Sequence, residues 1–327
     1  MSNLKPKVVL YFPAPDDVRE LLHQSFDLVT FEKVDASNKE AFVSAAKDAD
    51  GMIGMGLPVP TAELRGSSRL KAIATISTGY DAFDVAELTS QKVILMNLYD
   101  PLTETTADLA FSLIMSAGRR IAELDRKMRQ GLWTKPVTKE WFGLDIHGKT
   151  LGIVGMGRIG AAIARRGALG CGMSVLYTAR SPKRDAEDKY GARRCTLDDL
   201  LIESDYVCLV VPLSAETTHL IGERELKLMK ATSILVNIAR GSVVDENALI
   251  EALESGTIYG AGLDVFEREP LPLDSPLLSL PNVVLAPHIG SATLETRDAM
   301  ARYAAQSLVG FLIRGEARNV VNPDASR

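Results

Sequence analysis

The chain has 327 residues, enough for two domains that each bury a core, and 46% of the residues are hydrophobic while 24% are charged. This composition is typical of folded α/β proteins and excludes a disordered or fibrous chain. The net charge of −5 argues against a surface that binds nucleic acid or an anionic membrane, so neither is expected as a partner.

The cysteines and the N-terminal residues bear on the cellular location. Three scattered cysteines, Cys171, Cys195 and Cys208, are too few for a disulfide framework or a zinc site, and no metal site is expected. The first residues contain lysines but only a short apolar run that ends in prolines, which makes a poor signal peptide. No uncharged apolar stretch approaches the roughly 18 residues of a membrane span. We therefore expect a cytoplasmic protein in a reducing compartment.

Residues 1–102 alternate short apolar runs with amphipathic stretches. Strands are predicted at 8–12, 28–34, 51–55, 71–77 and 93–98, and helices at 18–26, 39–49, 62–68 and 83–91. The glycine-rich sequence GMIGMG at 51–56 does not have the spacing of a dinucleotide-binding turn and a proline follows it, so we interpret it as a loop at a strand end. Strands separated by helices of this length predict βαβ units and a parallel sheet.

Residues 103–130 have helical periodicity, an acidic first turn and Gly131 directly after their end. We predict one long helix, longer than one domain face needs, which suits a crossing between domains or packing against a second chain. The stretch 131–148, with Trp133 and Trp141, has no clear period and is expected to form an extended arm. The helix and the arm together favour a homodimer.

A second alternation of apolar runs and helical stretches covers residues 150–292, and a last amphipathic helix is predicted at 294–314. In a two-domain α/β protein such a final helix often returns to the first domain. We therefore predict one domain formed by residues 1–102 plus 293–327 and another formed by residues 103–292.

The first strand of the second region ends in a glycine-rich turn that reads Gly155-Met156-Gly157-Arg158-Ile159-Gly160, which fits GxGxxG. An apolar strand precedes this turn and a helix follows it, which is the context that a dinucleotide-binding turn requires. Gly155 permits the tight turn, Gly157 lets a pyrophosphate approach the backbone, and Gly160 allows close packing of helix and strand. The alternative is a tight turn without a ligand, which this context disfavours.

The strand predicted at 174–179 leads into a basic loop. An acidic residue at the end of this strand would bind the ribose 2′-hydroxyl of NAD, but no acid occurs before Asp185. The loop offers four residues that suit a 2′-phosphate: Arg180, Ser181, Lys183 and Arg184. Arg180 can pair with a phosphate through two N–H groups, and Ser181 can donate a hydrogen bond. A solvated basic loop is the alternative, but the missing acid favours NADPH, with NADH used at lower preference.

Three later segments each follow an apolar run, at the carboxyl end of a predicted strand, where open α/β sheets bind ligands. They are Asn237–Gly241 with Val244–Glu246 just after, Gly262–Pro270, and Pro287–Ser291. Together with the glycine turn, these segments resemble the D-isomer-specific 2-hydroxyacid dehydrogenases, and within them the glyoxylate/hydroxypyruvate reductases and the 2-ketogluconate reductases. The resemblance covers essentially the whole chain, including the turn Thr78–Asp81.

The resemblance implies a flavodoxin-like substrate-binding domain, a Rossmann cofactor domain and the reduction of a small 2-keto acid. Glyoxylate and hydroxypyruvate are the first choices, with 2-ketogluconate close behind. Arg240 would hold the substrate carboxylate and polarise the keto oxygen. His288 would give a proton to that oxygen, and Glu269 would favour the protonated imidazole. Glu267 competes with Glu269 for this role, and only the family pattern of an acid immediately before proline selects Glu269.

The resemblance also implies further contacts. Those with the cofactor would come from the glycine turn, the basic loop and Val211, Pro212, Ala239, Arg240, Asp264, His288 and Gly290. Those with the substrate would come from Met55, from the Thr78-Gly79 turn, and from Trp141 of a partner subunit. The alternative for Trp141 is a buried aromatic anchor within the arm.

Two other interpretations remain open. One is a non-enzymatic, dinucleotide-sensing binding protein of the same fold, which the complete set of Arg240, Glu269 and His288 disfavours. The other is a different enzyme of this architecture, such as a phosphoglycerate or formate dehydrogenase. The remaining histidines, His23, His147 and His219, are expected to be structural.

Overall fold

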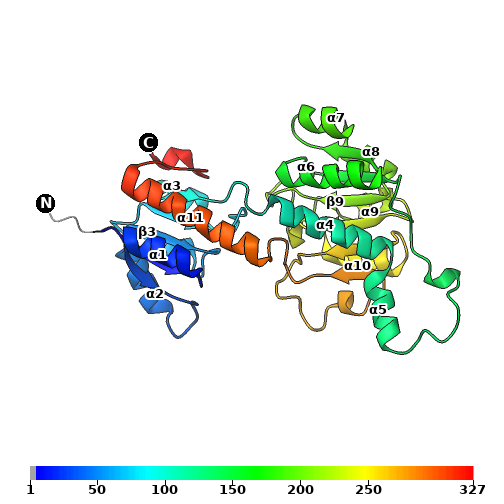
Figure 1. Ribbon diagram of the computed structural model, residues 1–327, viewed down its shortest axis with the longest axis horizontal. Helices are drawn as coiled ribbons and strands as arrows, with labels where there is room; N and C mark the ends of the chain where they lie inside the picture. Colours follow the sequence, from blue (N-terminus) through cyan, green and yellow to red (C-terminus); the bar gives the residue numbers. More distant parts are fainter. Residues whose placement is uncertain (1–4, 327) are drawn as a thin grey trace. The chain divides into compact units, whose positions relative to one another are not determined.

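A computed structural model describes residues 5–326 of the chain. The chain divides into two compact units (Figure 1). Unit 1 comprises Met1–Leu102 and Thr293–Arg327, and unit 2 comprises Thr103–Ala292. Each unit is built around a parallel sheet, so the predicted α/β fold with two parallel sheets is confirmed.

Unit 1 has a five-stranded parallel sheet with the strand order β2-β1-β3-β4-β5, which is the flavodoxin-like order. The strands are β1 (Lys7–Tyr11), β2 (Asp27–Thr30), β3 (Gly51–Gly54), β4 (Ala72–Thr75) and β5 (Ile94–Met96). The helices are α1 (Asp16–Ser25), α2 (Lys39–Lys47), α3 (Val85–Ser90) and α11 (Leu294–Arg314), with the 3₁₀ turns η1 (Thr61–Leu64) and η6 (Pro323–Ser326).

One prediction for unit 1 is wrong in detail, because the helix predicted at 62–68 is only the short turn η1. The glycine-rich segment forms strand β3 over Gly51–Gly54 and continues as a loop. Packing explains the glycines of this strand: a Cβ at Gly51 would lie 2.7 Å from Leu312, and a Cβ at Gly54 would lie 2.4 Å from the ring of Tyr11. These glycines therefore make room for neighbouring side chains within a buried sheet.

Unit 2 has a seven-stranded parallel sheet with the order β12-β11-β10-β9-β6-β7-β8. The strands are β6 (Thr150–Val154), β7 (Ser174–Thr178), β8 (Arg193–Arg194), β9 (Tyr206–Leu209), β10 (Ile234–Asn237), β11 (Gly260–Leu263) and β12 (Val283–Leu285). Counted within the unit, this is the doubly wound Rossmann order with one strand added. The strand order reverses between β6 and β9, which is where sheets of this kind bind ligands.

The helices of unit 2 cover both faces of its sheet. They are α4 (Thr103–Gly118), α5 (Ile121–Arg129), α6 (Arg158–Arg165), α7 (Arg184–Tyr190), α8 (Leu197–Glu203), α9 (Glu223–Leu228) and α10 (Glu246–Glu254). Four short turns complete the unit: η2 (Lys139–Trp141), η3 (Arg166–Gly170), η4 (Gly241–Val243) and η5 (Pro276–Leu278). The sequence predicted neither α7 nor the two-residue edge strand β8.

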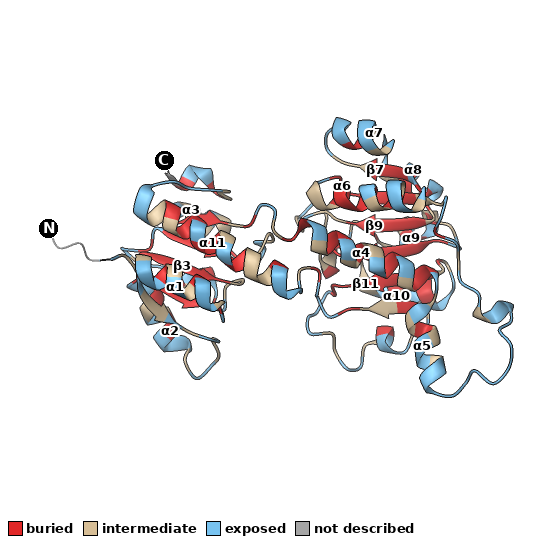
Figure 2. Cartoon of the chain, viewed as in Figure 1, coloured by how far each residue is buried: buried red, intermediate tan, exposed pale blue. Residues whose placement is uncertain are grey.

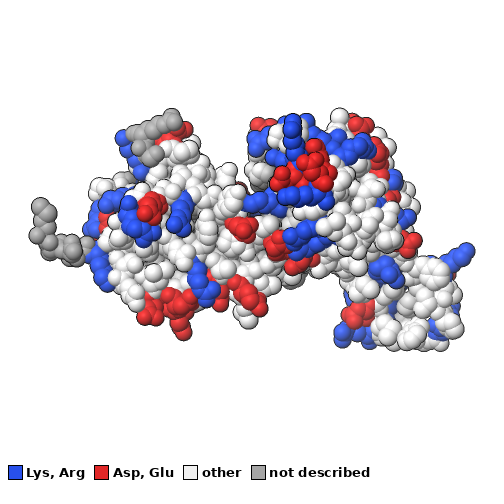
Figure 3. Space-filling model, turned by 45° about the horizontal axis from the view of Figure 1, so that its top comes forward, with Lys and Arg blue, Asp and Glu red and all other residues white. Residues whose placement is uncertain are grey.

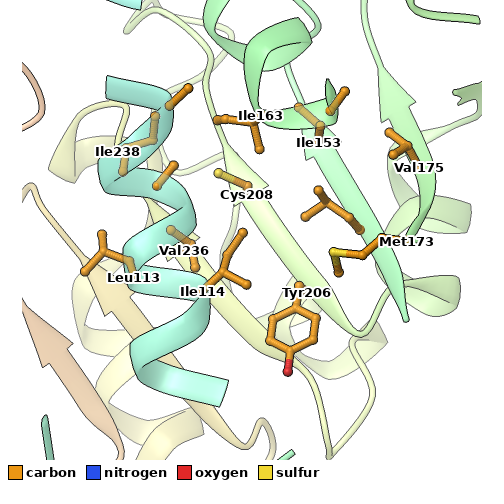
Figure 4. Packing of buried hydrophobic residues seen from close by; sticks show 14 of the residues in the cluster. Leu113, Ile114, Ile153, Ile163, Met173, Val175, Tyr206, Cys208, Val236 and Ile238 are labelled. Carbon is orange, nitrogen blue, oxygen red and sulfur yellow. The ribbon is translucent and has the colours of Figure 1, made fainter. Parts of the chain in front are cut away.

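Two apolar clusters fill the two faces of this sheet. Successive residues of a strand point to opposite faces, so Ile153 belongs to one cluster and Val154 to the other. Figure 4 shows the first cluster, in which Ile114 of α4 lies beside Val236 of β10. The inner strands β6, β9, β10 and β11 are buried from both sides (Figure 2), which explains why they are nearly continuous apolar runs in the sequence.

The single helix predicted at 103–130 is wrong, because the chain breaks between α4 and α5. Gly118 ends α4 under the ring of Tyr206, where a Cβ would lie 2.6 Å from the tyrosine oxygen. Arg120 adopts a left-handed conformation with φ of 58°, and its guanidinium pairs with Glu123 of α5 at 2.7 Å. The segment after α5 is mostly exposed and contains only the turn η2, as expected for an arm.

Two surface properties bear on the expected partners. On the face shown in Figure 3, lysine and arginine side chains are interspersed with aspartate and glutamate side chains, so that face carries no extended basic surface. Among residues 5–326, no helix is long and apolar enough to cross a membrane.

Candidate active site

The glycine turn joins β6 to α6 at the point where the strand order of unit 2 reverses. Gly155 has φ of 106°, and a Cβ there would lie 2.8 Å from the carbonyl oxygen of Val210, so only glycine suits this position. A Cβ at Gly160 would lie 2.3 Å from the carbonyl oxygen of Gly155. This position therefore needs glycine because helix and strand approach so closely.

Gly157 differs from the other two glycines because no atom lies within 4 Å of the place where its Cβ would be. Space is therefore open beside the backbone at the first turn of α6, where N–H groups have no partner within the helix. Met156 is buried beneath this turn, and Arg158 and Ile159 begin the helix. The turn thus fits a dinucleotide whose pyrophosphate lies against the backbone at Gly157.

The loop after β9 borders the glycine turn. Val211 lies beside Gly155, since a Cβ at that glycine would lie 3.0 Å from Cγ1 of the valine. The carbonyl oxygen of Pro212 accepts a hydrogen bond from Thr217 at 2.7 Å, which fixes the backbone of this loop. Val211 therefore borders the glycine turn, and contacts of Val211 and Pro212 with the cofactor stay a prediction.

The basic loop after β7 is held by its backbone, while both of its arginines, Arg180 and Arg184, remain exposed. The hydroxyl of Tyr177 accepts a hydrogen bond from the Lys183 N–H at 2.7 Å, and the guanidinium of Arg194 donates to the carbonyl oxygen of Ala179 at 2.8 Å. Arg180 is exposed, as are Ser181 and Arg184. The fixed backbone therefore presents the side chains of the loop to solvent, where a phosphate can reach them.

His288 and Glu269 form a close pair after strands β12 and β11. Nδ1 of His288 lies 2.7 Å from Oε2 of Glu269, and the backbone N–H of Phe266 donates to the other carboxylate oxygen at 3.1 Å. About half of the His288 side chain is exposed (48%), so Nε2 is left to face a reactant. A carboxylate on one ring nitrogen fixes the orientation of the imidazole.

Asp264 holds the backbone of the histidine segment. Its two carboxylate oxygens accept hydrogen bonds from the N–H groups of Ile289 and Gly290 at 2.7 and 2.9 Å, and its carbonyl oxygen accepts one from His288 at 2.9 Å. Burial raises the pKa of Asp264, while these backbone N–H groups and the nearby His288 oppose the rise. His288 itself has φ of 54°, a left-handed conformation that these hydrogen bonds sustain.

Arg240 follows β10 on a backbone that Asn237 fixes. The side-chain oxygen of Asn237 accepts from the N–H of Ala239 at 3.0 Å, and its amide nitrogen donates to the carbonyl oxygen of Arg240 at 3.0 Å. The next residue, Gly241, packs so tightly that a Cβ would lie 1.8 Å from the backbone of Phe266. The loops that carry Arg240 and Glu269 are therefore in direct contact.

Glu267 lies against a different histidine. Its Oε1 is 2.8 Å from Nε2 of His219, and its backbone N–H donates to the carboxylate of Glu246 at 3.1 Å. Of the two candidate carboxylates, the structure thus places Glu269 against His288 and Glu267 against His219. The sequence left this choice to the family pattern alone.

The residues expected to bind substrate in unit 1 lie after strands β3 and β4. The carbonyl oxygen of Thr78 accepts from the amide of Asn97 at 2.7 Å, and the hydroxyl of Ser77 donates to the carbonyl oxygen of Gly79. These bonds use carbonyl groups and leave the N–H groups of the turn available. Met55 follows β3 at the same edge of the sheet.

Trp141 is half-buried in its own chain, and Nζ of Lys127 lies 5.3 Å from the centroid of its ring. This cation–π contact ties the arm to α5. The contact fits an anchor within the arm, and the contribution of Trp141 to a partner's site stays a prediction.

Sequence reasoning missed the roles of two residues that organise the site: Arg194, which holds the basic loop, and Asn237, which holds Arg240. Each acts through contacts with residues distant in sequence or through a backbone turn. The only available signal was the position of Asn237 at the end of an apolar strand.

Comparisons with known proteins agree with this geometry. Residues 111–290 match the family model described as D-isomer specific 2-hydroxyacid dehydrogenase, NAD binding domain. The glyoxylate/hydroxypyruvate reductase B of Serratia proteamaculans is 49% identical over 320 residues, with 98% of both chains covered. The protein of that name from Enterobacter sp. is 49% identical over 324 residues, covering 98% of this chain and 99% of the relative.

A solved structure extends the likeness to three dimensions. The NADPH-dependent glyoxylate/hydroxypyruvate reductase of Sinorhizobium meliloti, crystallised in complex with NADP and malonate, has a TM-score of 0.84 and 34% identity, and 98% of each chain is covered. The family match covers more than half of the chain, and the curated relatives match nearly all of it. The chain therefore belongs to the D-isomer-specific 2-hydroxyacid dehydrogenases.

Proposed function

We propose that this protein reduces glyoxylate and hydroxypyruvate to the corresponding D-2-hydroxy acids with NADPH, and that 2-ketogluconate is a further substrate. The pair of His288 and Glu269, held 2.7 Å apart beside the loop of Arg240, is the observation that carries the proposal. The names of the curated relatives support these substrates. Formation of a D-2-hydroxy acid follows from the family.

Three side chains of unit 2 perform the work on the substrate. Arg240 binds the substrate carboxylate and draws charge toward the keto oxygen through its fork of N–H donors. Nε2 of His288 gives its proton to the keto oxygen as negative charge develops there. Glu269 keeps the imidazole oriented through its contact with Nδ1. The bound nicotinamide supplies the hydride that reduces C2.

Asp264 and Asn237 are positioning residues in this scheme. Asp264 fixes the backbone on both sides of Ile289, and Asn237 fixes the backbone on both sides of Arg240. Ala239 and Gly290 lie within these fixed segments, where the resemblance implies contact with the nicotinamide end of the cofactor. The turn Thr78-Gly79 of unit 1 binds the substrate carboxylate through its backbone N–H groups.

NADPH is the proposed cofactor because of the basic loop after β7. Arg180 pairs with the 2′-phosphate, Ser181 donates a hydrogen bond to it, and the cations Lys183 and Arg184 add positive charge. The Sinorhizobium meliloti reductase, crystallised with NADP, supports this choice. NADH lacks the 2′-phosphate and is expected to be used at lower preference.

A panel of 2-keto acids tests the proposed function. The purified protein is mixed with NADPH and one 2-keto acid per reaction, and the loss of nicotinamide absorbance is followed. The acids are glyoxylate, hydroxypyruvate, 2-ketogluconate and the phosphorylated 2-keto acid whose reduction gives phosphoglycerate. We expect turnover of the first two acids at the highest kcat/KM. Turnover of none of them would favour a dinucleotide-sensing protein, and a preference for the phosphorylated acid would favour a phosphoglycerate dehydrogenase.

A homodimer is proposed on independent grounds. Large apolar side chains are exposed along α5 and the arm, where Figure 2 shows a mostly exposed segment: Ile121, Met128, Leu132, Trp133, Val137 and Phe142. Exposed apolar surface of this extent on one segment marks an interaction site. A second copy covers it in the proposal, and Trp141 lies within the same segment. Light scattering that gives the mass of a monomer at micromolar concentration would overturn the dimer and the role of Trp141 in a partner's site.

A further inference from the structure

Arg297 in unit 1 is an unusual arginine because it is half-buried and forms no ion pair with any carboxylate of residues 5–326. Its Nη1 lies 3.1 Å from the sulfur of Met55, a weak acceptor. Burial lowers the pKa of Arg297, and no neighbouring charge compensates for it. By contrast, Arg302 and Arg314 on the same helix pair with Asp17 and Glu316.

The direction of α11 places Arg297 at the carboxyl edge of the unit 1 sheet. Near the C-terminal end of the helix, Leu308 and Leu312 lie over Gly51, the first residue of β3. Near its N-terminal end, Arg297 lies beside Met55, which directly follows β3. The helix therefore runs antiparallel to β3, and its first turn stands over the edge where the loops after β3 and β4 emerge.

A second polar group at this edge also lacks a partner. The side-chain oxygen of Thr78 is buried and has no hydrogen-bond partner among the described residues. Thr78 follows β4, which pairs with β3 up to Gly54 and Thr75. A half-buried guanidinium without a carboxylate and a buried hydroxyl without a partner cost stability where they stand. Such groups are expected where a ligand completes their hydrogen bonds.

We propose that Arg297 determines specificity by donating a hydrogen bond to a polar group on C3 of the 2-keto acid. This inference rests on the proposed function, and it names the part of the substrate that unit 1 recognises beyond the carboxylate. Hydroxypyruvate carries a hydroxyl on C3, pyruvate carries only hydrogens there, and glyoxylate has no C3. Arg297 therefore distinguishes these three acids.

Physical chemistry predicts a large discrimination. A site that hydrogen-bonds a substrate hydroxyl rejects the analogue that lacks it, because the donor is then left desolvated and without a partner. Glyoxylate is small enough to leave the guanidinium hydrated, so it escapes this penalty. Arg297 accordingly favours hydroxypyruvate over pyruvate and has little influence on glyoxylate.

The test compares wild type with Arg297→Met, which keeps the length and apolar stem but removes the donors. In Arg297→Met, kcat/KM for hydroxypyruvate is expected to fall by about 10- to 100-fold, with glyoxylate within about threefold of wild type. The kcat/KM for pyruvate is expected to stay the same or rise, so the preference for hydroxypyruvate over pyruvate collapses. Arg302→Met on the same helix is the matched control and leaves all three values within about twofold.

The melting temperature separates specificity from folding. Because the substitution removes a half-buried charge without a carboxylate partner, Arg297→Met is expected to melt at or above the wild-type temperature. If that variant does not fold, Arg297→Lys gives the same comparison, with about a three- to tenfold loss for hydroxypyruvate alone. Equal losses for all three acids, or no change in the ratio of hydroxypyruvate to pyruvate, would overturn the inference. A wild-type protein that reduces none of the acids would overturn the proposed function itself.

Discussion

The two ends of the carboxyl edge of the unit 2 sheet differ in whether their functional side chains are held by other residues. At β10–β12, side chains are fixed: His288 is paired with Glu269, and Asp264 and Asn237 hold the backbone. At β6 and β7, the backbone is fixed, and Arg180 and Arg184 of the basic loop are exposed to solvent. The difference indicates that proton transfer requires an oriented side chain, whereas phosphate binding requires a shaped backbone and accessible positive charge.

The largest expected effect concerns the two histidine–glutamate pairs of the first end. His288→Ala is expected to lower kcat for glyoxylate by about a hundred- to ten-thousandfold because the proton donor is removed. His219→Ala, which breaks the neighbouring pair of similar length, is expected to keep kcat within about threefold. Steady-state kinetics of both variants checks this contrast. Equal losses would mean that the pairs do not differ in function.

The next largest effect is expected when the carboxylates of the same two pairs are replaced. Glu269→Gln keeps the shape but replaces the carboxylate that holds Nδ1 of the imidazole, so the proton donor is less well oriented and kcat is expected to fall by about 10- to 100-fold. Glu267→Gln is expected to leave kcat nearly unchanged. It should also change the free energy of unfolding by less than about 1 kcal/mol, since its pair with His219 is partly exposed. Denaturant titration and kinetics measure both quantities, and a larger loss in Glu267→Gln would reverse the assignment.

Substitutions in the basic loop after β7 are expected to change the preference for NADPH over NADH. Arg180→Ser removes a bidentate donor, so kcat/KM for NADPH is expected to fall by about tenfold or more, while the value for NADH stays within about twofold. The measurement uses saturating glyoxylate and varies the concentration of each cofactor in separate experiments. A parallel loss with NADH would show that Arg180 supports the loop rather than the 2′-phosphate.

The smallest expected effect tests whether the fixed backbone of the basic loop contributes to cofactor binding in addition to the charges of its side chains. Arg194→Met removes the hydrogen bonds to the carbonyl oxygen of Ala179 and loosens the loop, so KM for NADPH is expected to rise by about two- to fivefold. Lys189→Met, on the neighbouring helix α7, is the matched control because its pairing is with Asp185 in the same helix. An unchanged KM in Arg194→Met would remove this positioning role.

The sequence predicted the parts of this site that depend on local pattern. The glycine turn was recognisable because its glycines have fixed spacing between a strand and a helix, and the position of His288 followed from its place after an apolar run. The alternation of strands and helices likewise predicted both sheets, because buried parallel strands are apolar on both faces.

The remainder depends on contacts between distant segments. The break between α4 and α5 arises where Gly118 packs under Tyr206, which lies in strand β9. The choice between Glu267 and Glu269 depends on which histidine each carboxylate faces. Arg194 holds the basic loop from an edge strand of only two residues. None of these contacts has a periodic signal in the sequence.

A calorimetric titration of NADPH into His288→Ala and Arg180→Ser tests most directly whether the two ends of the edge have separate roles. We expect His288→Ala to bind NADPH within about threefold of the wild-type Kd, and Arg180→Ser to bind it at least about tenfold more weakly. A His288→Ala variant that loses NADPH affinity as strongly as Arg180→Ser would contradict the account, because the fixed end would then also bind the cofactor's phosphate end.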